Sequence, residues 1–341
     1  MVDKTCLFTL VDKLRVVWEI THKCNYICLH CCADAKSKGD GELTLNSVKK
    51  GVDNLVAHGL GSIYFSGGEP LTRKDFLEIL TYAAALIPPK SINFATNGRL
   101  VTPEIAKRVS QLDIGNVLVS LDGHDSETAQ KFRGIKECYV DAVNAISRLA
   151  DEDVKVRLGV VIWAGNYRHL EEFIKIGIDV GANNIFFNWL VPIGRAKGND
   201  KIELDLSLYF NIAHELESLR QKYGDKISVG FHRFEQLDDM DENCQAGIKI
   251  LHIIPDGRVS PCSWIYKVDN HVLSKQKISE ASLDEILKEE PFELIRQMQG
   301  DRLKCGSGPG CLAMCKAFAG DYLTIDPLYK NGGLWVKKNE S

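Results

Sequence analysis

The chain has 341 residues, and its hydrophobic fraction of 45 % supplies a sizeable core and excludes a disordered chain. Its 42 basic and 46 acidic side chains leave a net charge of −4, without the basic excess typical of nucleic-acid-binding proteins. No apolar run approaches the roughly 18 residues of a membrane span, and no secretory signal opens the chain, which predicts a soluble, cytoplasmic protein with no nucleic-acid or membrane partner.

Strand-like and helix-like segments alternate from about residue 14 to residue 190. Apolar runs of strand length occur at 14–20, 62–65, 92–95, 116–121, 154–162 and 184–190, and helical spacing occurs at 44–58, 74–87, 103–111, 138–150 and 168–180. Near-continuous apolar strands between helices indicate an α/β fold with a parallel sheet. Right-handed crossovers curl such units into a partial (β/α)6 TIM-like barrel or a doubly wound sheet, with functional residues at the carboxyl ends of the strands.

The alternation is expected to stop after residue 200. A bridging helix is predicted over 206–222, a hairpin around Asp256-Gly257, and short helices near 282–289 and 292–299. The segment through the last cysteines has few apolar residues, so a metal is expected to stabilise it. The predicted organisation is a barrel over 1–205, a bridging helix and connection over 206–240, a small α+β domain over 241–330 and a polar tail over 331–341.

Eleven cysteines, an odd number, do not fit a complete intrachain disulfide framework. All except Cys6 and Cys138 fall into two clusters, which predicts two metal sites. The first cluster, Cys24-x3-Cys28-x2-Cys31, directly follows the first strand. Three thiols there suit either zinc with a fourth ligand or an iron–sulfur cube with one open iron.

The second predicted strand ends in Ser66-Gly67-Gly68-Glu69-Pro70. Paired glycines let the backbone approach a ligand closely. Combined with the cysteine triad, this strand end resembles the radical S-adenosylmethionine (SAM) superfamily, which has a Cys-x3-Cys-x2-Cys loop and a Gly-Gly-Glu-Pro motif at these places. The resemblance continues in order at later strand ends, through Thr96-Asn97-Gly98, Ser120-Leu121-Asp122-Gly123, Arg133-Gly134 and Pro192-Ile193-Gly194-Arg195.

The resemblance implies a role for each of these motifs. Cys24, Cys28 and Cys31 would hold three irons of a [4Fe–4S] cluster, and SAM would chelate the fourth iron. Glu69, with the backbone of Gly67 and Gly68, would bind the SAM ammonium. Arg133 would pair with the SAM carboxylate, which suits a guanidinium fork. The remaining implied contacts are Asn97 and Ser120 at the ribose or carboxylate and Leu190 near the adenine.

The second cluster resembles the auxiliary iron–sulfur extension of these enzymes, called SPASM in its full form and twitch in its shorter form. Its candidate ligands are Cys244, Cys262, Cys305, Cys311 and Cys315, one of which would be spare. Arg302 and Tyr329 stand where two ligands of a second auxiliary cluster would be, so one auxiliary [4Fe–4S] cluster is expected. A structural zinc site is the alternative, because zinc and iron–sulfur sites share tetrathiolate geometry.

The function that the resemblance implies is reductive cleavage of SAM to a 5′-deoxyadenosyl radical, which abstracts a hydrogen atom from a substrate. The expected outcome is oxidation or maturation of a peptide or natural product, by an oxidoreductase supplied with electrons by a reductant such as flavodoxin or ferredoxin. Modification of a tetrapyrrole side chain and dehydrogenation of a sugar or aminocyclitol are alternatives. A non-catalytic iron–sulfur redox sensor is the alternative from another class, and Gly67-Gly68-Glu69-Pro70 and Arg133 argue against it, since a sensor needs no SAM pocket.

Overall fold

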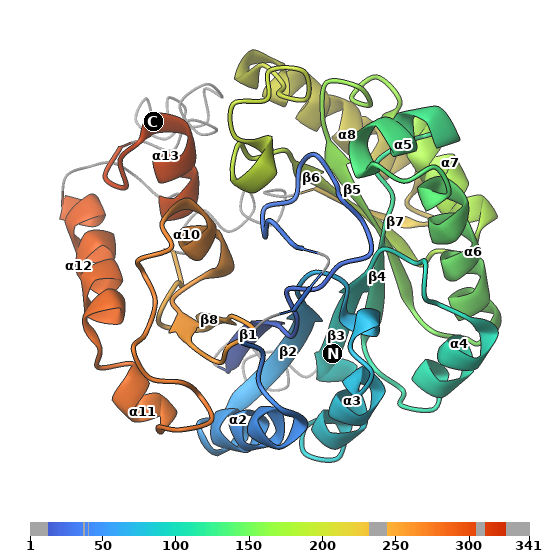
Figure 1. Ribbon diagram of the computed structural model, residues 1–341. Helices are drawn as coiled ribbons and strands as arrows, with labels where there is room; N and C mark the ends of the chain where they lie inside the picture. Colours follow the sequence, from blue (N-terminus) through green and yellow to red (C-terminus); the bar gives the residue numbers. More distant parts are fainter. Residues whose placement is uncertain (1–12, 37, 40, 232–243, 305–310, 325–341) are drawn as a thin grey trace, which may run out of the picture.

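The computed structural model describes residues 13–36, 38–39, 41–231, 244–304 and 311–324. Its centre is a nine-stranded sheet in the order β7-β6-β5-β4-β3-β2-β1-β8-β9, and only β8 and β9 pair antiparallel. Figure 1 shows the parallel strands curving around the interior with helices outside them, which confirms the predicted partial barrel. The strands are β1 (Leu14–Glu19), β2 (Leu60–Ser66), β3 (Ile92–Thr96), β4 (Asn116–Ser120), β5 (Val156–Ile162), β6 (Asn184–Trp189), β7 (Ser228–Phe231), β8 (Ile250–Ile253) and β9 (Val259–Ser260).

Helices cover the outer face of the barrel because one side of each strand is apolar. On β1, for example, Val16 and Trp18 are buried toward the helices, whereas Arg15 lies on the opposite face. Thr44 begins the first of these helices by accepting a hydrogen bond from the Ser47 N–H. The barrel helices are α2 (Leu45–Ala57), α3 (Phe76–Ala84), α4 (Pro103–Ser110), α5 (Ser126–Arg133), α6 (Cys138–Asp151), α7 (Leu170–Asp179) and α8 (Tyr209–Tyr223), with short 3₁₀ helices η1 (Pro70–Thr72), η2 (Pro89–Ser91), η3 (Gly194–Ala196) and η4 (Leu206–Leu208).

The sheet continues beyond the six units that the sequence predicts. The helix α8 leads into β7, which pairs in parallel with β6, so the alternation does not stop near residue 200. At the other edge, β8 pairs in parallel with β1 and in a hairpin with β9, and Gly257 in the connecting turn has φ = +93°. The auxiliary segment is therefore part of the same sheet as the barrel, and its first strand lies beside the strand that precedes the cysteine loop.

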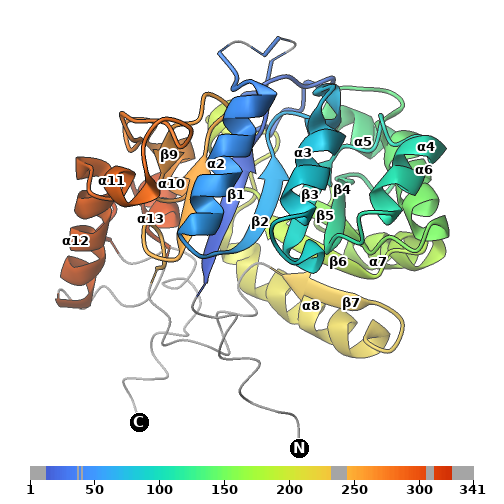
Figure 2. The same cartoon turned by 90° about the horizontal axis from the view of Figure 1, so that it is seen from below.

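The carboxyl-terminal helices lie beside this edge of the sheet (Figures 1 and 2). They surround a second apolar cluster that includes Ile265, Ile295 and Leu312. These helices are α10 (Ser263–Val268), α11 (Leu283–Ile286), α12 (Glu290–Lys304) and α13 (Leu312–Ala319). The polar tail predicted over 331–341 lies outside the described residues.

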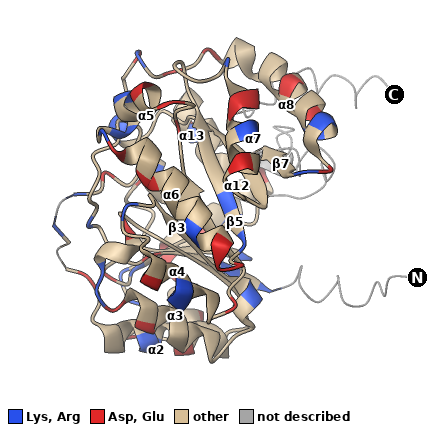
Figure 3. Ribbon diagram, turned by 90° about the vertical axis from the view of Figure 1, so that its right-hand side faces the viewer, with Lys and Arg blue, Asp and Glu red and all other residues tan. Residues whose placement is uncertain are grey.

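The outer surface of the barrel carries both signs of charge. Figure 3 shows acidic and basic residues interspersed along the helices on this side. No helix in the described ranges is both long enough and apolar enough to cross a membrane.

Candidate active site

The three cysteines of the first cluster lie on the loop that follows β1, at the carboxyl ends of the parallel strands. Each thiol is partly buried. Burial raises the pKa of Cys28 to about 12, Arg133 opposes this rise, and the charges of Cys31 and Cys24 add to it because these thiols are near neighbours. The N–H groups of Tyr26 and Ala35 lie 3.4 Å from the Sγ atoms of Cys24 and Cys31, respectively.

The three thiols of this cysteine loop form the donor set that an iron–sulfur cube with one open iron uses. In a cube each thiolate binds a different iron, so the thiols surround a larger centre than one ion. The triad supplies three such thiols, and Arg133 lowers the pKa of Cys24 and of Cys28 against the larger effect of burial.

The glycine pair after β2 packs against the backbone of this loop. A Cβ atom on Gly67 would lie 2.4 Å from the Thr21 oxygen, and one on Gly68 would lie 2.1 Å from the Lys23 oxygen. The N–H of Gly68 donates to the Thr21 oxygen at 2.7 Å, and the N–H of Glu69 donates to the Lys23 oxygen at 2.8 Å. The close approach that paired glycines indicate is therefore made to the cysteine loop, whose entry it fixes against β2.

The Glu69 carboxylate is 1 % exposed and ties β2 to β3. Its Oε1 accepts from the Thr96 hydroxyl at 2.9 Å and from the Leu71 N–H at 3.1 Å, and its Oε2 accepts from the Asn97 N–H at 2.7 Å. Burial raises the pKa of Glu69 to about 7, against the lowering effect of these donors and of Arg133. A cationic ligand group beside this carboxylate would favour its charged form.

Asn97 extends the same network to the cluster cysteines. Its side-chain amide donates to Asn25 Oδ1 at 2.6 Å and lies 4.0 Å from the Sγ of Cys24. Ser120 is the half-buried last residue of β4 and makes no side-chain hydrogen bond with a described residue. The structure thus brings Glu69, Asn97 and Cys24 together at the ends of neighbouring elements.

Arg133 lies at the end of α5 and is 5 % exposed. Its Nη2 lies 2.6 Å from Asp122 Oδ2, and its Nε is buried without a partner among the described residues. Asp122 is fully buried, and its Oδ1 accepts from the Val161 N–H at 2.7 Å. The sequence motif contained Asp122, but its role depends on a contact with α5 that no local pattern predicts.

An aromatic stack stands beside this ion pair. The ring of His30 stacks on Phe132 with centroids 4.1 Å apart, and Phe132 stacks on Trp163 at 4.5 Å. Burial lowers the pKa of His30 to about 4, so the imidazole is neutral at physiological pH. Leu190 is 5 % exposed and packs in the same cluster as Phe132 and Trp163, which places it at the end of β6 near the cysteine loop.

Arg195 holds the cysteine loop from the other side of the barrel. Its Nε donates to the Cys28 carbonyl oxygen at 2.8 Å, and its Nη1 donates to the Ala35 oxygen at 2.9 Å and pairs with Asp34 at 3.0 Å. These three contacts anchor the loop through Arg195. Next to it, Gly194 allows a close approach, because a Cβ there would lie 2.4 Å from the Cys31 oxygen.

Three auxiliary cysteines converge in the carboxyl-terminal part. Burial raises the pKa of Cys262 to about 12, and the charges of Cys311 and Cys244 add to this rise because both thiols are close. All three pack against the second apolar cluster. Cys315 is buried one helical turn after Cys311, and Cys305 lies outside the described residues.

A buried ionic group connects β1 to the auxiliary part. Glu19 Oε1 lies 2.6 Å from Lys267 Nζ on α10 and 3.4 Å from His252 Nε2 on β8. Burial alone would raise the pKa of Glu19, but Lys267 and His252 outweigh it and lower this pKa to about 2. Sequence reasoning missed this group because a carboxylate inside an apolar strand has no local signal for partners more than 200 residues away.

Comparison with known proteins supports the assignment of both parts. The family model of the radical SAM superfamily matches residues 18–177, and that of the SPASM iron–sulfur cluster-binding domain matches residues 244–315. The chain is 29 % identical to an AdoMet-dependent heme synthase of Methanosarcina barkeri, over 93 % of this chain and 97 % of that protein. It is also 29 % identical to the mycofactocin maturase MftC of Mycobacterium tuberculosis, over 89 % of this chain and 78 % of that protein.

Its fold is similar to that of Streptococcus suis SuiB bound to the precursor peptide SuiA, with a TM-score of 0.76, 16 % identity, and coverage of 94 % of this chain and 77 % of that one. The two matched domains imply SAM, a [4Fe–4S] cluster and an auxiliary iron–sulfur cluster as cofactors. With its cysteine loop at the strand ends of a partial barrel, the chain carries a radical SAM domain over residues 18–177 and a SPASM domain over residues 244–315.

Proposed function

We propose that the protein cleaves SAM reductively and abstracts a hydrogen atom from a substrate, oxidising or maturing a peptide or another natural product. The observation that carries this proposal is the contact between the cysteine loop and the Glu69–Asn97 network, which joins a cluster-ligand set to a buried carboxylate at one edge of the sheet. When bound, the cluster and SAM would supply a one-electron reductive cleavage of SAM, and 5′-deoxyadenosine would form once the adenosyl fragment takes the substrate hydrogen atom. A small electron-transfer protein, such as flavodoxin or ferredoxin, is the proposed reductant.

The residues of the chain are proposed to bind and orient the cofactors. Cys24, Cys28 and Cys31 ligate the cluster, and Arg195 holds their loop in place through its backbone carbonyls. Glu69 accepts from the SAM ammonium. Arg133 donates its otherwise unpartnered Nε–H to the SAM carboxylate, while Asp122 holds the guanidinium in position. The proposed contacts of Gly67, Gly68, Ser120 and Leu190 with SAM follow from their places at the same strand ends.

Modification of a tetrapyrrole side chain is the second candidate reaction. It is favoured by the similarity to an AdoMet-dependent heme synthase, which extends over 97 % of that protein's length. The mycofactocin maturase has the same identity over a smaller share of its own length, 78 %, and favours maturation of a natural product.

Formation of 5′-deoxyadenosine tests the shared first step of both candidates. Protein reconstituted with iron and sulfide under anaerobic conditions, and then reduced, is expected to convert SAM to 5′-deoxyadenosine and methionine. Chromatography of the products measures this reaction. A fully loaded and reduced protein that leaves SAM intact would support the redox-sensor alternative instead.

The Glu69→Gln variant is expected to bind SAM about ten- to a hundredfold more weakly, because loss of a charge-assisted hydrogen bond costs roughly 1.5–3 kcal/mol. Iron content should stay unchanged, since no metal ligand is removed. With the pKa of Glu69 raised to about 7, its carboxyl is mostly protonated at about pH 6 and charged above pH 7. Wild-type affinity for SAM should therefore rise roughly eightfold between about pH 6 and 7.5.

Equilibrium binding of SAM at both pH values measures these effects. The matched control is Glu104→Gln, an exposed glutamate on α4, which should bind SAM as the wild type does. An unchanged affinity in Glu69→Gln would remove this carboxylate from the SAM site.

We further propose that the segment 241–330 holds one auxiliary cluster. Cys244, Cys262 and Cys311 are three of its ligands, and Cys305 or Cys315 is the fourth. Two cubes per chain give about eight irons and eight sulfides, and the Cys24/Cys28/Cys31→Ala variant should retain about half of them. Iron and sulfide analysis measures this number. About twelve irons would contradict a single auxiliary cluster, and stoichiometric zinc in the triple variant would support a structural zinc site.

A further inference from the structure

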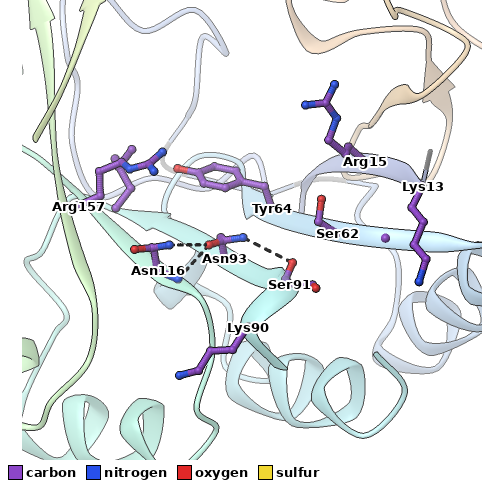
Figure 4. Close-up of a pocket in the computed structure, with 11 residues that line it drawn as sticks. Lys13, Arg15, Ser62, Tyr64, Lys90, Ser91, Asn93, Asn116 and Arg157 are labelled. Carbon is purple, nitrogen blue, oxygen red and sulfur yellow. Dashed lines mark hydrogen bonds between the residues drawn. The ribbon is translucent and has the colours of Figure 1, made fainter. Parts of the chain in front are cut away.

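A cavity of about 450 Å³ lies at the amino-terminal ends of the strands, away from the cysteine loop. Among the described residues, its lining contains four cationic side chains, from Lys13, Arg15, Lys90 and Arg157, and no acidic one. In Figure 4 the Arg157 guanidinium and the Tyr64 hydroxyl point toward each other, and Arg15 extends over the strand that carries Ser62.

The strand alternation places this lining on the inner face of the barrel. Ser62 and Tyr64 alternate along β2 with the buried residues Ile63 and Phe65, which face the helices. The registers connect these positions across the sheet, since Arg15 is opposite Ser62, Tyr64 opposite Asn93, Asn93 opposite Asn116, and Leu118 opposite Arg157. Mostly polar and cationic side chains at these inward-facing positions thus extend from β1 to β5, with the apolar Leu118 among them.

The positive charge of this cavity is only partly compensated. Lys90 pairs with Asp113, outside the lining. Lys13 and Arg15 form no ion pair with any described residue. Arg157 donates from Nε to the neutral Asn184 Oδ1 at 2.7 Å, so this contact leaves its charge unbalanced. In a chain with a net charge of −4, like charges held around one cavity create a local field that favours an anion.

The polar groups between these cations are already oriented. Asn93 Oδ1 accepts from the Asn116 N–H at 2.9 Å, and the Asn93 amide lies 3.5 Å from the Ser91 oxygen. The hydroxyls of Ser62 and Tyr64 make no hydrogen bond with a described residue and so are available as donors. Burial raises the pKa of Tyr64 despite the opposing effect of Arg157, so this hydroxyl keeps its proton.

We propose that this cavity binds carboxylate groups of the substrate, and that the substrate is a small organic molecule carrying two or more carboxylates. Guanidinium forks bind carboxylates in bidentate geometry, and the nearby hydroxyls add neutral donors. The proposal rests on the proposed function, because the reacting part of the substrate must then lie at the SAM end of the barrel. Along β2, Tyr64 and Gly67 are roughly 10 Å apart at ~3.3 Å per residue, a span that a tetrapyrrole with carboxylate side chains can bridge.

Coproporphyrin III, a tetracarboxylate with its own absorbance and fluorescence, is the probe for this site. Reconstituted protein without SAM is titrated with it, and the optical change measures binding. Arg15→Gln and Arg157→Gln are each expected to weaken binding at least about tenfold. Arg15 is exposed, so its replacement leaves the core intact. The matched control, Arg108→Gln on the outside of α4, should bind as the wild type does.

Two further measurements separate the alternatives. SAM cleavage without substrate is expected to be unchanged in both variants. If the wild-type protein does not cleave SAM, the proposed function is refuted, but the titration with coproporphyrin III still tests the carboxylate site. Inorganic phosphate is titrated as the second anion. Wild-type binding of coproporphyrin III by both variants overturns the carboxylate site. Binding of phosphate but not of the porphyrin also overturns it, since the cavity would then serve a free inorganic anion.

Discussion

The Cys28→Ala variant is expected to lose SAM cleavage completely and to remain folded. The Cys28 carbonyl accepts from Arg195 through the backbone, so the substitution removes the thiol and leaves the loop anchored. A cluster with only two protein ligands would be lost or misplaced. Product analysis for 5′-deoxyadenosine measures the first effect, and iron content, expected to fall by about half, measures the second.

Cys32→Ala is the matched control for this experiment, because Cys32 lies on the same loop, is exposed, and is not a proposed ligand. It should keep both the iron and the activity of the wild type. Unchanged turnover in Cys28→Ala would contradict the ligand assignment. Loss of iron in Cys32→Ala with retention in Cys28→Ala would move the assignment to Cys32.

Local pattern was enough to predict most of the barrel. The strands that begin at Leu14, Ile92 and Asn116 are apolar and flanked by helices with clear amphipathic spacing. The spacing of apolar residues therefore distinguishes strand from helix in this region. The hairpin at Gly257 also has a local signal, because a turn with positive φ favours glycine. The order of motifs at the strand ends then placed the cysteine loop beside Glu69 and Asn97.

The missing parts depend on longer-range contacts or weaker signals. The helix α5 was not predicted because it is short and polar. Its one local sequence signal is Asp125, whose side chain caps the helix by accepting a hydrogen bond from the Thr128 N–H. The strand β7 has only four residues, which is too few for a periodic pattern, and pairing with β6 stabilises it. The contact between Asp122 and Arg133 follows from the packing of α5, and the contact of β8 with β1 brings Lys267 to Glu19.

The Lys267→Met variant is expected to lose roughly 3–5 kcal/mol of unfolding free energy at neutral pH, because it leaves Glu19 buried beside only His252. The pKa of Glu19 is lowered to about 2 from an ordinary 4.5, which corresponds to a contribution of about 3 kcal/mol to the unfolding free energy. A lowered pKa contributes stability above pH 4.5 that is lost as the pH falls toward 2. In the variant, burial without the lysine raises this pKa, so the difference from the wild type should shrink in mild acid.

Urea unfolding of the reconstituted protein at about pH 7.5 and 5.5, under anaerobic conditions, measures both effects. Lys49→Met is the control, because its pair with Glu78 is more exposed to solvent and should contribute less than about 1 kcal/mol. The double variant Glu19→Gln/Lys267→Met should recover most of the loss, since it removes both charges from the buried site. Two results together would contradict this prediction: the same loss of unfolding free energy in Lys267→Met at both pH values, and no recovery of that loss when Glu19→Gln is added. The lysine would then stabilise the sheet edge by packing, and the link between the barrel and the auxiliary part would not be electrostatic.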